Sequence, residues 1–323
     1  MAGQAVRRAG LLVNPRSGKS SGRGLGLVAM LRNNPAVSAR VLERFEELPG
    51  VLDGFARDGV TDLFISSGDG TVHAIQTELA ERKPFRIVPR LCILPHGTTN
   101  MIAADLGLRF KNLQAQADCI TRLETGDTRT RPALRIVNPA DNKPRQGMCL
   151  GTGAAAEATL FCQRAFNANG VKGSWATFAT LANAVARTMF TKPNPHDVTR
   201  FDRPFAIEIV SDGKTFCTGT QLLMVSSTLE KLVMGARPFW GGKLAPIRTS
   251  VFPYPVPSIR RWLLPVMYGG ENRKMPKGAV SFSSNRLEIT SSTMYVIDGE
   301  FFDGPKNEPL KVETGALFTY ICG

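Results

Sequence analysis

Glycine combined with hydroxyl, amide or carboxylate side chains follows three apolar runs in the first half of the chain. The segments are Asn14-Pro15-Arg16-Ser17-Gly18, Ser67-Gly68-Asp69-Gly70-Thr71 and Pro95-His96-Gly97-Thr98-Thr99-Asn100. Glycine lets backbone N–H groups approach a phosphate closely, and a helix that begins there adds partial positive charge. The hydroxyls of Ser17, Thr71, Thr98 and Thr99 can donate to phosphate or adenosine oxygens. Alone, NPRSG would indicate a capped turn, but the three segments together favour a nucleotide site.

Asp69 is the candidate catalytic group of these loops because it lies between two glycines at the end of an apolar run. A carboxylate beside phosphates could hold Mg²⁺ or accept the proton of a substrate hydroxyl. The structural alternative is a turn aspartate that caps the next helix. The two similar loops favour the chemical interpretation, although neither G-x-x-x-x-G-K-S/T nor G-x-G-x-x-G occurs in the chain.

The elements that must position these loops alternate between strand and helix. Strands are expected at 10–13, 38–44, 62–70 and 90–100, the last two running into their loops, and helices at 24–32, 47–59, 71–82 and 112–126. This alternation predicts a parallel α/β sheet, in which all three loops lie at the carboxyl edge, where ligands bind. After about residue 130 the pattern becomes antiparallel β, with a helical segment at 155–190 and a final strand within 315–323.

Composition limits the classes of partner. The 323 residues suggest two domains, and a net charge of +13 with a pI of about 9.8 favours anionic partners. The basic residues are dispersed without a nucleic-acid-binding motif, which argues against nucleic acid. The six cysteines lack a C-x-x-C pair, so buried free thiols in a reducing compartment are expected. Neither a signal peptide nor an apolar run of membrane-spanning length occurs, which predicts a cytoplasmic or peripheral protein.

Several motifs together resemble the diacylglycerol kinase, sphingosine kinase and ceramide kinase superfamily. SSGDGTVHAI and LPHGTTNMIAADLG carry the resemblance, with NPRSGKSSG matching an N-P-x-S-G opening and IDGEFFDGP a D-G-E motif at 298–300. GMCLGTGAAAEATL and GGKLAPI resemble the second domain of that family. The motifs follow the family order over nearly the whole chain.

The resemblance implies a Rossmann-like parallel-sheet nucleotide domain at 1–130, joined by a C-terminal strand at 305–323. It also implies a β-sandwich lipid-binding domain at 131–304, with the active site in the interdomain cleft. Such enzymes use ATP and Mg²⁺ to transfer the γ-phosphoryl group to a lipid hydroxyl at the inner face of the membrane. The lipid would be a ceramide or sphingoid base, toward which the S-G-D-G variant points, or diacylglycerol.

The resemblance also assigns roles to individual residues. Asp69 and Glu300 are the candidates for catalytic base and Mg²⁺ ligand. Asp69 is the preferred Mg²⁺ ligand, and either of the two could be the catalytic base. Without the other motifs, Asp298-Gly299-Glu300 would be read as a hairpin turn. Arg164 and Lys172 lie near basic phosphate contacts of the family, or else form a solvated basic face. The expected ATP site comprises Asn14, Ser17, Gly18, Gly68, Asp69, Gly70, Thr71, Gly97, Thr98, Thr99, Asn100, Arg164, Lys172, Gly299 and Glu300.

The chain also departs from the family pattern. Ser67 replaces the first glycine of G-G-D-G-T, Met101 replaces an acidic residue, Ala74 replaces a glutamate, and GTGAAAEA lacks an aspartate. These losses could change metal use or the lipid, or remove activity; retention of Asp69 and Glu300 favours an active enzyme. The alternatives are an enzyme similar to NAD kinase, which shares the G-D-G-T logic, and a non-catalytic nucleotide-binding regulator.

Two segments are candidates for contact with an anionic membrane surface. Residues 256–270 place Arg260 and Arg261 beside Trp262 and several aliphatic side chains, and 236–243 is similar. A core element with flanking charges is the alternative. Prolines at 253, 255, 257 and 265 argue against a long amphipathic helix. The sequence leaves the oligomeric state open.

Overall fold

The computed structural model describes residues 7–16, 21–97, 100–122, 126–169, 202–256 and 258–322, with isolated positions between 186 and 200. The chain forms two compact units. The first contains Met1–Ala133, Leu229–Gly235 and Gly315–Gly323, and the second contains Leu134–Thr228 and Ala236–Thr314.

The first unit is built on a parallel sheet. Its strands are β1 (Ala9–Val13), β2 (Val37–Val41), β3 (Asp62–Ser67) and β4 (Arg90–Pro95), in the order β4-β3-β1-β2. The end of β15 (Leu310–Ile321) adds a fifth parallel strand, with Tyr320 opposite Leu91. β3 is buried along its whole length, as expected for a strand covered on both faces.

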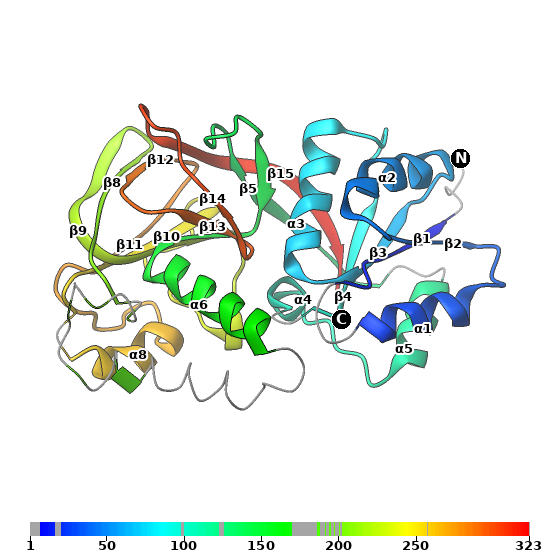
Figure 1. The fold of residues 1–323 in the computed structure, drawn as a ribbon, viewed down its shortest axis with the longest axis horizontal. Coiled ribbons are helices and arrows are strands. Elements are labelled where there is room, and N and C mark those ends of the chain that lie inside the picture. The colour runs from blue at the N-terminus through cyan, green and yellow to red at the C-terminus, as the bar shows by residue number, and fades with distance from the viewer. Residues whose placement is uncertain are drawn as a thin grey trace. The chain divides into compact units, whose positions relative to one another are not determined.

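Helices cover both faces of this sheet (Figure 1). α1 (Ser21–Leu31) and α5 (Leu113–Thr121) lie on one face, and α2 (Leu48–Arg57) and α3 (Asp69–Thr77) on the other. A π-helical turn at Glu78–Arg82 continues α3, and the short α4 spans Met101–Asp105. The chain moves from β1 to β2 in one direction and then returns to β3, so the strand order reverses beside β1. Ligands bind at such switch points in open α/β sheets.

The second unit is an antiparallel β structure. Its strands run in the order β14-β13-β7-β9-β8-β12-β15, and β10 pairs with both β9 and β11. Burial alternates along β8, where Phe205, Ile207 and Ile209 face the core and Glu208 faces solvent. The strands are β5 (Thr128–Ile136, which begins in the first unit), β6 (Arg145–Gly147), β7 (Cys149–Gly153), β8 (Phe205–Ser211), β9 (Lys214–Ser227), β10 (Ile247–Pro253), β11 (Val280–Ser284), β12 (Arg286–Ser291), β13 (Tyr295–Ile297) and β14 (Glu300–Phe302).

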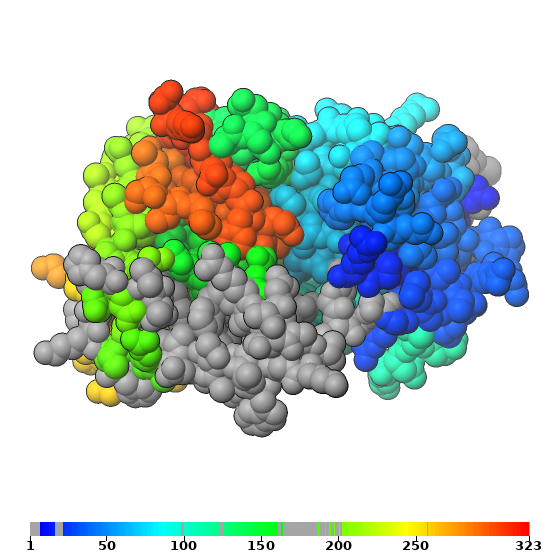
Figure 2. All heavy atoms as spheres, in the orientation of Figure 1, coloured from blue at the N-terminus to red at the C-terminus, as the bar shows by residue number. Residues whose placement is uncertain are grey.

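One apolar core is shared by side chains from nearly all strands of the second unit. The helices described in it are α6 (Ala154–Asn169), where a helix was predicted over 155–190, and α8 (Ile259–Tyr268). The rest of that predicted helix lies largely outside the described residues. Figure 2 shows atoms of the orange segment that contains the β13–β14 hairpin on the face in view; all three residues of β13 are buried, whereas Glu300 of β14 is exposed. The predicted fold class, a parallel α/β part followed by an antiparallel β part, is confirmed.

Candidate active site

The loops after β3 and β4 touch through two glycines. A Cβ atom built on Gly97 would lie 2.4 Å from the Cα of Gly68 and 3.2 Å from its nitrogen, so only glycine permits this approach. Asn100 closes the second loop: its Oδ1 accepts from the Gly97 N–H (2.7 Å), and its Nδ2 donates to the Gly97 carbonyl (2.8 Å). The paired strand ends, with Ser67 opposite Pro95, bring these loops together.

The loop after β1 joins them through Asn14. The Asn14 backbone N–H donates to the Ser66 carbonyl (3.1 Å), and its Nδ2 donates to Thr71 Oγ1 (2.9 Å) in the first turn of α3. Its Oδ1 accepts from the Arg16 N–H (3.0 Å). The described residues of all three glycine-containing loops therefore lie together at the carboxyl edge of the parallel sheet.

Asp69 is the first residue of α3 and lies where these loops converge. Its Oδ2 accepts from the Met101 N–H (3.1 Å), whereas its Oδ1 is buried and has no hydrogen-bond partner among the described residues. Burial raises the pKa of this carboxyl, and the backbone N–H groups of Met101 and Ile102 offset the increase only in part. A buried acceptor without a donor is costly to keep and fits a site completed by a ligand.

The described residues around Asp69 limit how Mg²⁺ could be held. Among them, no group of three or more His, Cys, Asp or Glu side chains could hold a metal ion. Mg²⁺ is commonly bound by one or two carboxylates, with phosphate oxygens and water completing its coordination. The unpartnered Oδ1 of Asp69 fits that mode, with a nucleotide as the source of the remaining ligands.

A buried polar chain, which the sequence did not indicate, supports the third loop. His96 Nε2 lies 3.0 Å from Gln116 Oε1, and His96 Nδ1 lies 2.7 Å from Ser66 Oγ. Because Gln116 Oε1 can only accept, Nε2 carries the proton and Nδ1 accepts from the serine hydroxyl. Burial lowers the pKa of His96, which keeps the ring neutral. The hydrogen bonds from Ser66 through His96 to Gln116 thus connect β3, the start of the Gly97 loop and α5.

Asp298 has a structural role in the second unit. Asp298 and Gly299 form the two-residue turn between β13 and β14 with positive φ angles of 48° and 93°. The Asp298 carboxylate accepts from the N–H groups of Met148 (2.8 Å) and Cys149 (2.9 Å). Glu300 begins β14 and is exposed. Its predicted cooperation with Asp69 across an interdomain cleft stays a prediction.

The departures from the family pattern lie around Asp69. Met101 supplies only its backbone N–H to Asp69, and its side chain is buried. Ser67 is buried, and its Oγ has no partner among the described residues; Ala74 is half-buried on α3. Several predicted nucleotide contacts lie outside the described residues: Ser17, Gly18, Thr98, Thr99, Lys172 and the side chain of Arg164.

A segment from the middle of the chain also packs in the first unit, which no sequence signal indicated. Leu229–Gly235 returns there, and the Lys231 N–H donates to Asp105 Oδ1 (2.8 Å). The guanidinium of Arg131 lies 3.5 Å from Asp105 and 3.2 Å from Glu230. These contacts anchor the segment beside α4.

Comparisons with known proteins agree with this fold. Residues 8–130 match the family model of the diacylglycerol kinase catalytic domain. A candidate diacylglycerol kinase of Bacillus anthracis str. Sterne is similar in structure (TM-score 0.65, 16% identity, 100% of this chain and 98% of that chain covered). A diacylglycerol kinase structure from the same organism is also similar, with a TM-score of 0.64, 15% identity, and 99% of this chain and 98% of that chain covered.

Yeast NADH kinase in complex with NADH is more distant, with a TM-score of 0.50, 11% identity, and 99% of this chain and 84% of that chain covered. Comparison with curated proteins gave no match. At these identities the structural similarities establish a common fold. The range that the family model matches contains the predicted motifs of the first unit. The match of residues 8–130 to the diacylglycerol kinase catalytic-domain model supports the superfamily that the motifs predicted.

Proposed function

We propose that this protein is an ATP-dependent lipid kinase that transfers the γ-phosphoryl group of ATP to a lipid hydroxyl. A ceramide, a sphingoid base or a diacylglycerol would be the acceptor. One observation carries the proposal: Oδ1 of Asp69, which is buried and has no hydrogen-bond partner among the described residues, lies where the loops after β1, β3 and β4 meet. A kinase needs a carboxylate there, beside the phosphates that the loops receive.

The loops suit a polyphosphate. The first N–H groups of an α-helix have no partner within the helix, and α3 and α1 both begin at the edge where the loops converge. The glycines at 68 and 97 expose backbone at a point where a side chain would not fit. The chain therefore binds the phosphates chiefly with backbone donors and uses side chains to hold the loops in place.

Asp69 can act in either of two ways. Its raised pKa makes its carboxylate a stronger base toward the lipid hydroxyl. Alternatively, its Oδ1 would hold Mg²⁺, which when bound supplies positive charge that neutralises the phosphates. Glu300 of the second unit is the other candidate for either role, and the two roles stay undivided.

The second unit offers a surface that fits an anionic membrane. Leu263, Leu264 and Tyr268 of α8 are 40%, 66% and 51% exposed, and no residue of this helix is buried. Arg260 and Arg261 on the same helix are exposed. Apolar side chains that enter the interface beside cations that meet anionic lipids bind such surfaces. Among the described residues, no helix is long and apolar enough to cross a membrane.

The two segments predicted for membrane contact are joined within this unit. The Arg237 N–H donates to the Met267 carbonyl (2.6 Å). The Arg273 guanidinium donates to the carbonyls of Val266 (2.6 Å) and Arg237 (2.9 Å) and lies 5.9 Å from the centroid of the Trp240 ring. Residues 236–243 therefore pack beside α8, but their Ala236, Pro238 and Phe239 are buried, as the alternative of a core element with flanking charges expects. The exposed side chains of α8 therefore carry the proposal of a peripheral position at the inner face of the membrane.

The test is transfer of label from γ-labelled ATP with Mg²⁺ to ceramide, sphingoid bases and diacylglycerol in mixed micelles, with NAD as a soluble acceptor. Asp69→Asn should reduce transfer by about 10²–10⁴-fold, the usual contribution of a positioned acid–base group. The matched control is Asp53→Asn, which should retain activity. Asp53 lies on α2, and its exposed carboxylate is paired with Arg82.

Each other outcome has a defined meaning. Full activity of Asp69→Asn would refute the assignment of the site. Transfer to NAD and to no lipid would favour the enzyme similar to NAD kinase. Binding of ATP without transfer to any acceptor would favour a nucleotide-binding regulator.

A further inference from the structure

A second pocket lies at the opposite edge of the parallel sheet from the candidate active site. Its floor includes Ala9, Val37, Asp62 and Arg90, which begin or lie at the start of β1 to β4, and α5 forms one of its walls. The cavity measures about 360 Å³, a volume typical of small-molecule sites. No described residue of the three glycine-containing loops lines it, so the kinase function does not account for it.

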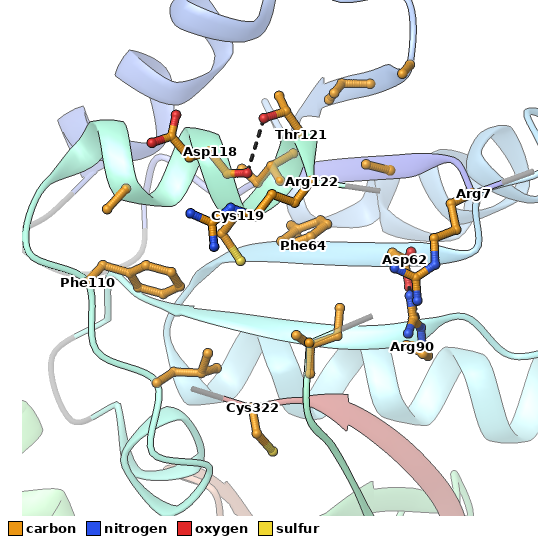
Figure 3. Close-up of a pocket in the computed structure, with 18 of the residues that line it drawn as sticks. Arg7, Asp62, Phe64, Arg90, Phe110, Asp118, Cys119, Thr121, Arg122 and Cys322 are labelled. Atoms are coloured by element: carbon orange, nitrogen blue, oxygen red, sulfur yellow. Dashed lines mark hydrogen bonds and ion pairs between the residues drawn. The ribbon is translucent and has the colours of Figure 1, made fainter. Parts of the chain in front are cut away.

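Thiols are the reactive groups of this pocket. Cys119 on α5 is half-buried and is directed into the cavity on the side of Phe64 and Phe110, as Figure 3 shows. Cys322 lines the cavity as well. Cys92 of β4 is fully buried, and its thiol lies close enough to Cys119 for each thiol to shift the pKa of the other. Of these two thiols, only Cys119 lines the pocket and is within reach of a molecule in it.

Positive charge predominates around Cys119. The hydrogen bond from the Cys92 thiol and the nearby Arg122 guanidinium lower the pKa of Cys119 to about 7. Proximity to Cys119 and burial raise the pKa of Cys92, which keeps its proton. Asp62 is ion-paired with Arg90, and Asp118 accepts from Gln114 (2.8 Å). The charged groups that line the cavity are Arg7, Asp62, Arg90, Arg109, Asp118 and Arg122.

We propose that Cys119 is a thiol-modification site, at which this cationic pocket admits a small anionic disulfide such as glutathione disulfide. The Cys119 thiolate attacks one sulfur of the disulfide, so a new S–S bond forms as the original S–S bond breaks. Cys119 is oxidised, and the departing half of the disulfide is reduced to a thiolate that takes a proton from water. The product is a mixed disulfide on α5, and no further oxidant is required.

The rate advantage can be worked from the chemistry of thiols. A thiol with a pKa of about 7 is half ionised at pH 7, whereas an ordinary thiol with a pKa of about 8.5 is only about 3% ionised. Nucleophilicity falls with pKa, with a Brønsted coefficient of about 0.4–0.5, and this removes most of the sixteenfold gain. Ionisation alone therefore predicts a reaction about threefold faster, and attraction of the anionic reagent adds to it.

The experiment treats the full chain with glutathione disulfide at pH 7 and quantifies adducts on all six cysteines by peptide mass spectrometry. Cys119 should react at least threefold faster than Cys149, the other half-buried described thiol. Cystamine, a cationic disulfide, should react with Cys119 more slowly than glutathione disulfide. A Cys92–Cys119 disulfide would also support the proposal, because the fully buried Cys92 cannot react first.

Variants separate the site from general thiol reactivity. Arg122→Gln should raise the pH midpoint of Cys119 modification above 7 and reduce the preference for the anionic reagent. Lys111→Gln, outside the pocket lining, is the control, and circular dichroism checks that each variant folds. The proposal fails if Cys149 or Cys162 reacts as fast as Cys119. It also fails if both reagents modify Cys119 equally fast in the wild type and in Arg122→Gln.

Discussion

Substitution of Gly97 by alanine tests the contact on which the candidate active site depends. The added methyl carbon would lie 2.4 Å from the Gly68 Cα, and ordinary contact begins near 3.4 Å, so the two loops must separate by about 1 Å. Both atoms belong to rigid backbone rather than to a flexible side chain. Overpacking of this kind costs about 1–3 kcal/mol of unfolding free energy.

The same displacement should impair nucleotide use more than stability. A shift of about 1 Å in a positioning group can reduce the rate by about 10²-fold. We therefore expect Gly97→Ala to lower kcat/KM for ATP by one to two orders of magnitude, measured by steady-state kinetics, while urea denaturation reports the loss of stability.

Gly50→Ala is the matched control for this change. Gly50 lies within α2, and a Cβ there would meet nothing within 4 Å. Alanine should stabilise this helix by about 0.4–1 kcal/mol and leave ATP kinetics unchanged. Unaltered stability and kcat/KM in Gly97→Ala would refute the close approach of the two loops.

Three further predictions follow from other parts of the molecule. Leu264→Asp on α8 should weaken binding to anionic vesicles about fivefold or more, since it replaces roughly 1 kcal/mol of interfacial burial with a repelled charge. Leu317→Asp, at a leucine of similar exposure (67% against 66%), should leave this binding unchanged. Equal sedimentation of the two variants with vesicles would contradict α8 as the membrane contact. Asp298→Ala leaves the N–H groups of Met148 and Cys149 without their acceptor and should lower the free energy of unfolding by about 2–4 kcal/mol. Asp298→Asn, which keeps one acceptor oxygen, should lower it less. An equal loss of stability in the two variants would argue that the Asp298 carboxylate does not stabilise these two N–H groups. The raised pKa of Asp69 means that folding opposes its ionisation, so its contribution to stability is fully present below the unfolded pKa of about 3.9 and is lost as pH rises through the folded pKa. Over this pH range the melting temperature of Asp69→Asn should increasingly exceed that of the wild type, and above it the difference should stay constant. A difference in melting temperature that does not depend on pH would contradict burial as the cause of the raised pKa.

The fold class was predictable because its signals are local. Apolar runs of strand length alternate with segments of helical periodicity up to about residue 130, and a two-residue period appears afterwards. The glycines at 68 and 97 marked loops that follow strands, and parallel pairing places such loops at one edge. Strand limits were less predictable: β2 ends at Val41 rather than at residue 44.

The candidate site was predictable only in its composition. The position of Asp69 between two glycines indicated a chemical role, and β13 and β14 form the hairpin that was the structural alternative for the D-G-E motif. No local pattern indicated that Asp298 would bind two backbone N–H groups of β7 and the residue before it, or that His96 would lie between Ser66 and Gln116. These partners are far apart in the chain, and their contact depends on strand order.

The sequence by itself determined which segments form strands, which loops carry phosphate-binding residue types, and which family model residues 8–130 match. Only the tertiary structure decided that Gly97 touches Gly68, that Asp69 has a buried oxygen without a partner among the described residues, and that Cys119 lines a pocket at the start of the parallel strands. Backbone periodicity and turn preferences act over a few residues, so the sequence records them directly. Burial and hydrogen bonding between distant segments arise only when the order β4-β3-β1-β2 and the covering helices bring those segments together.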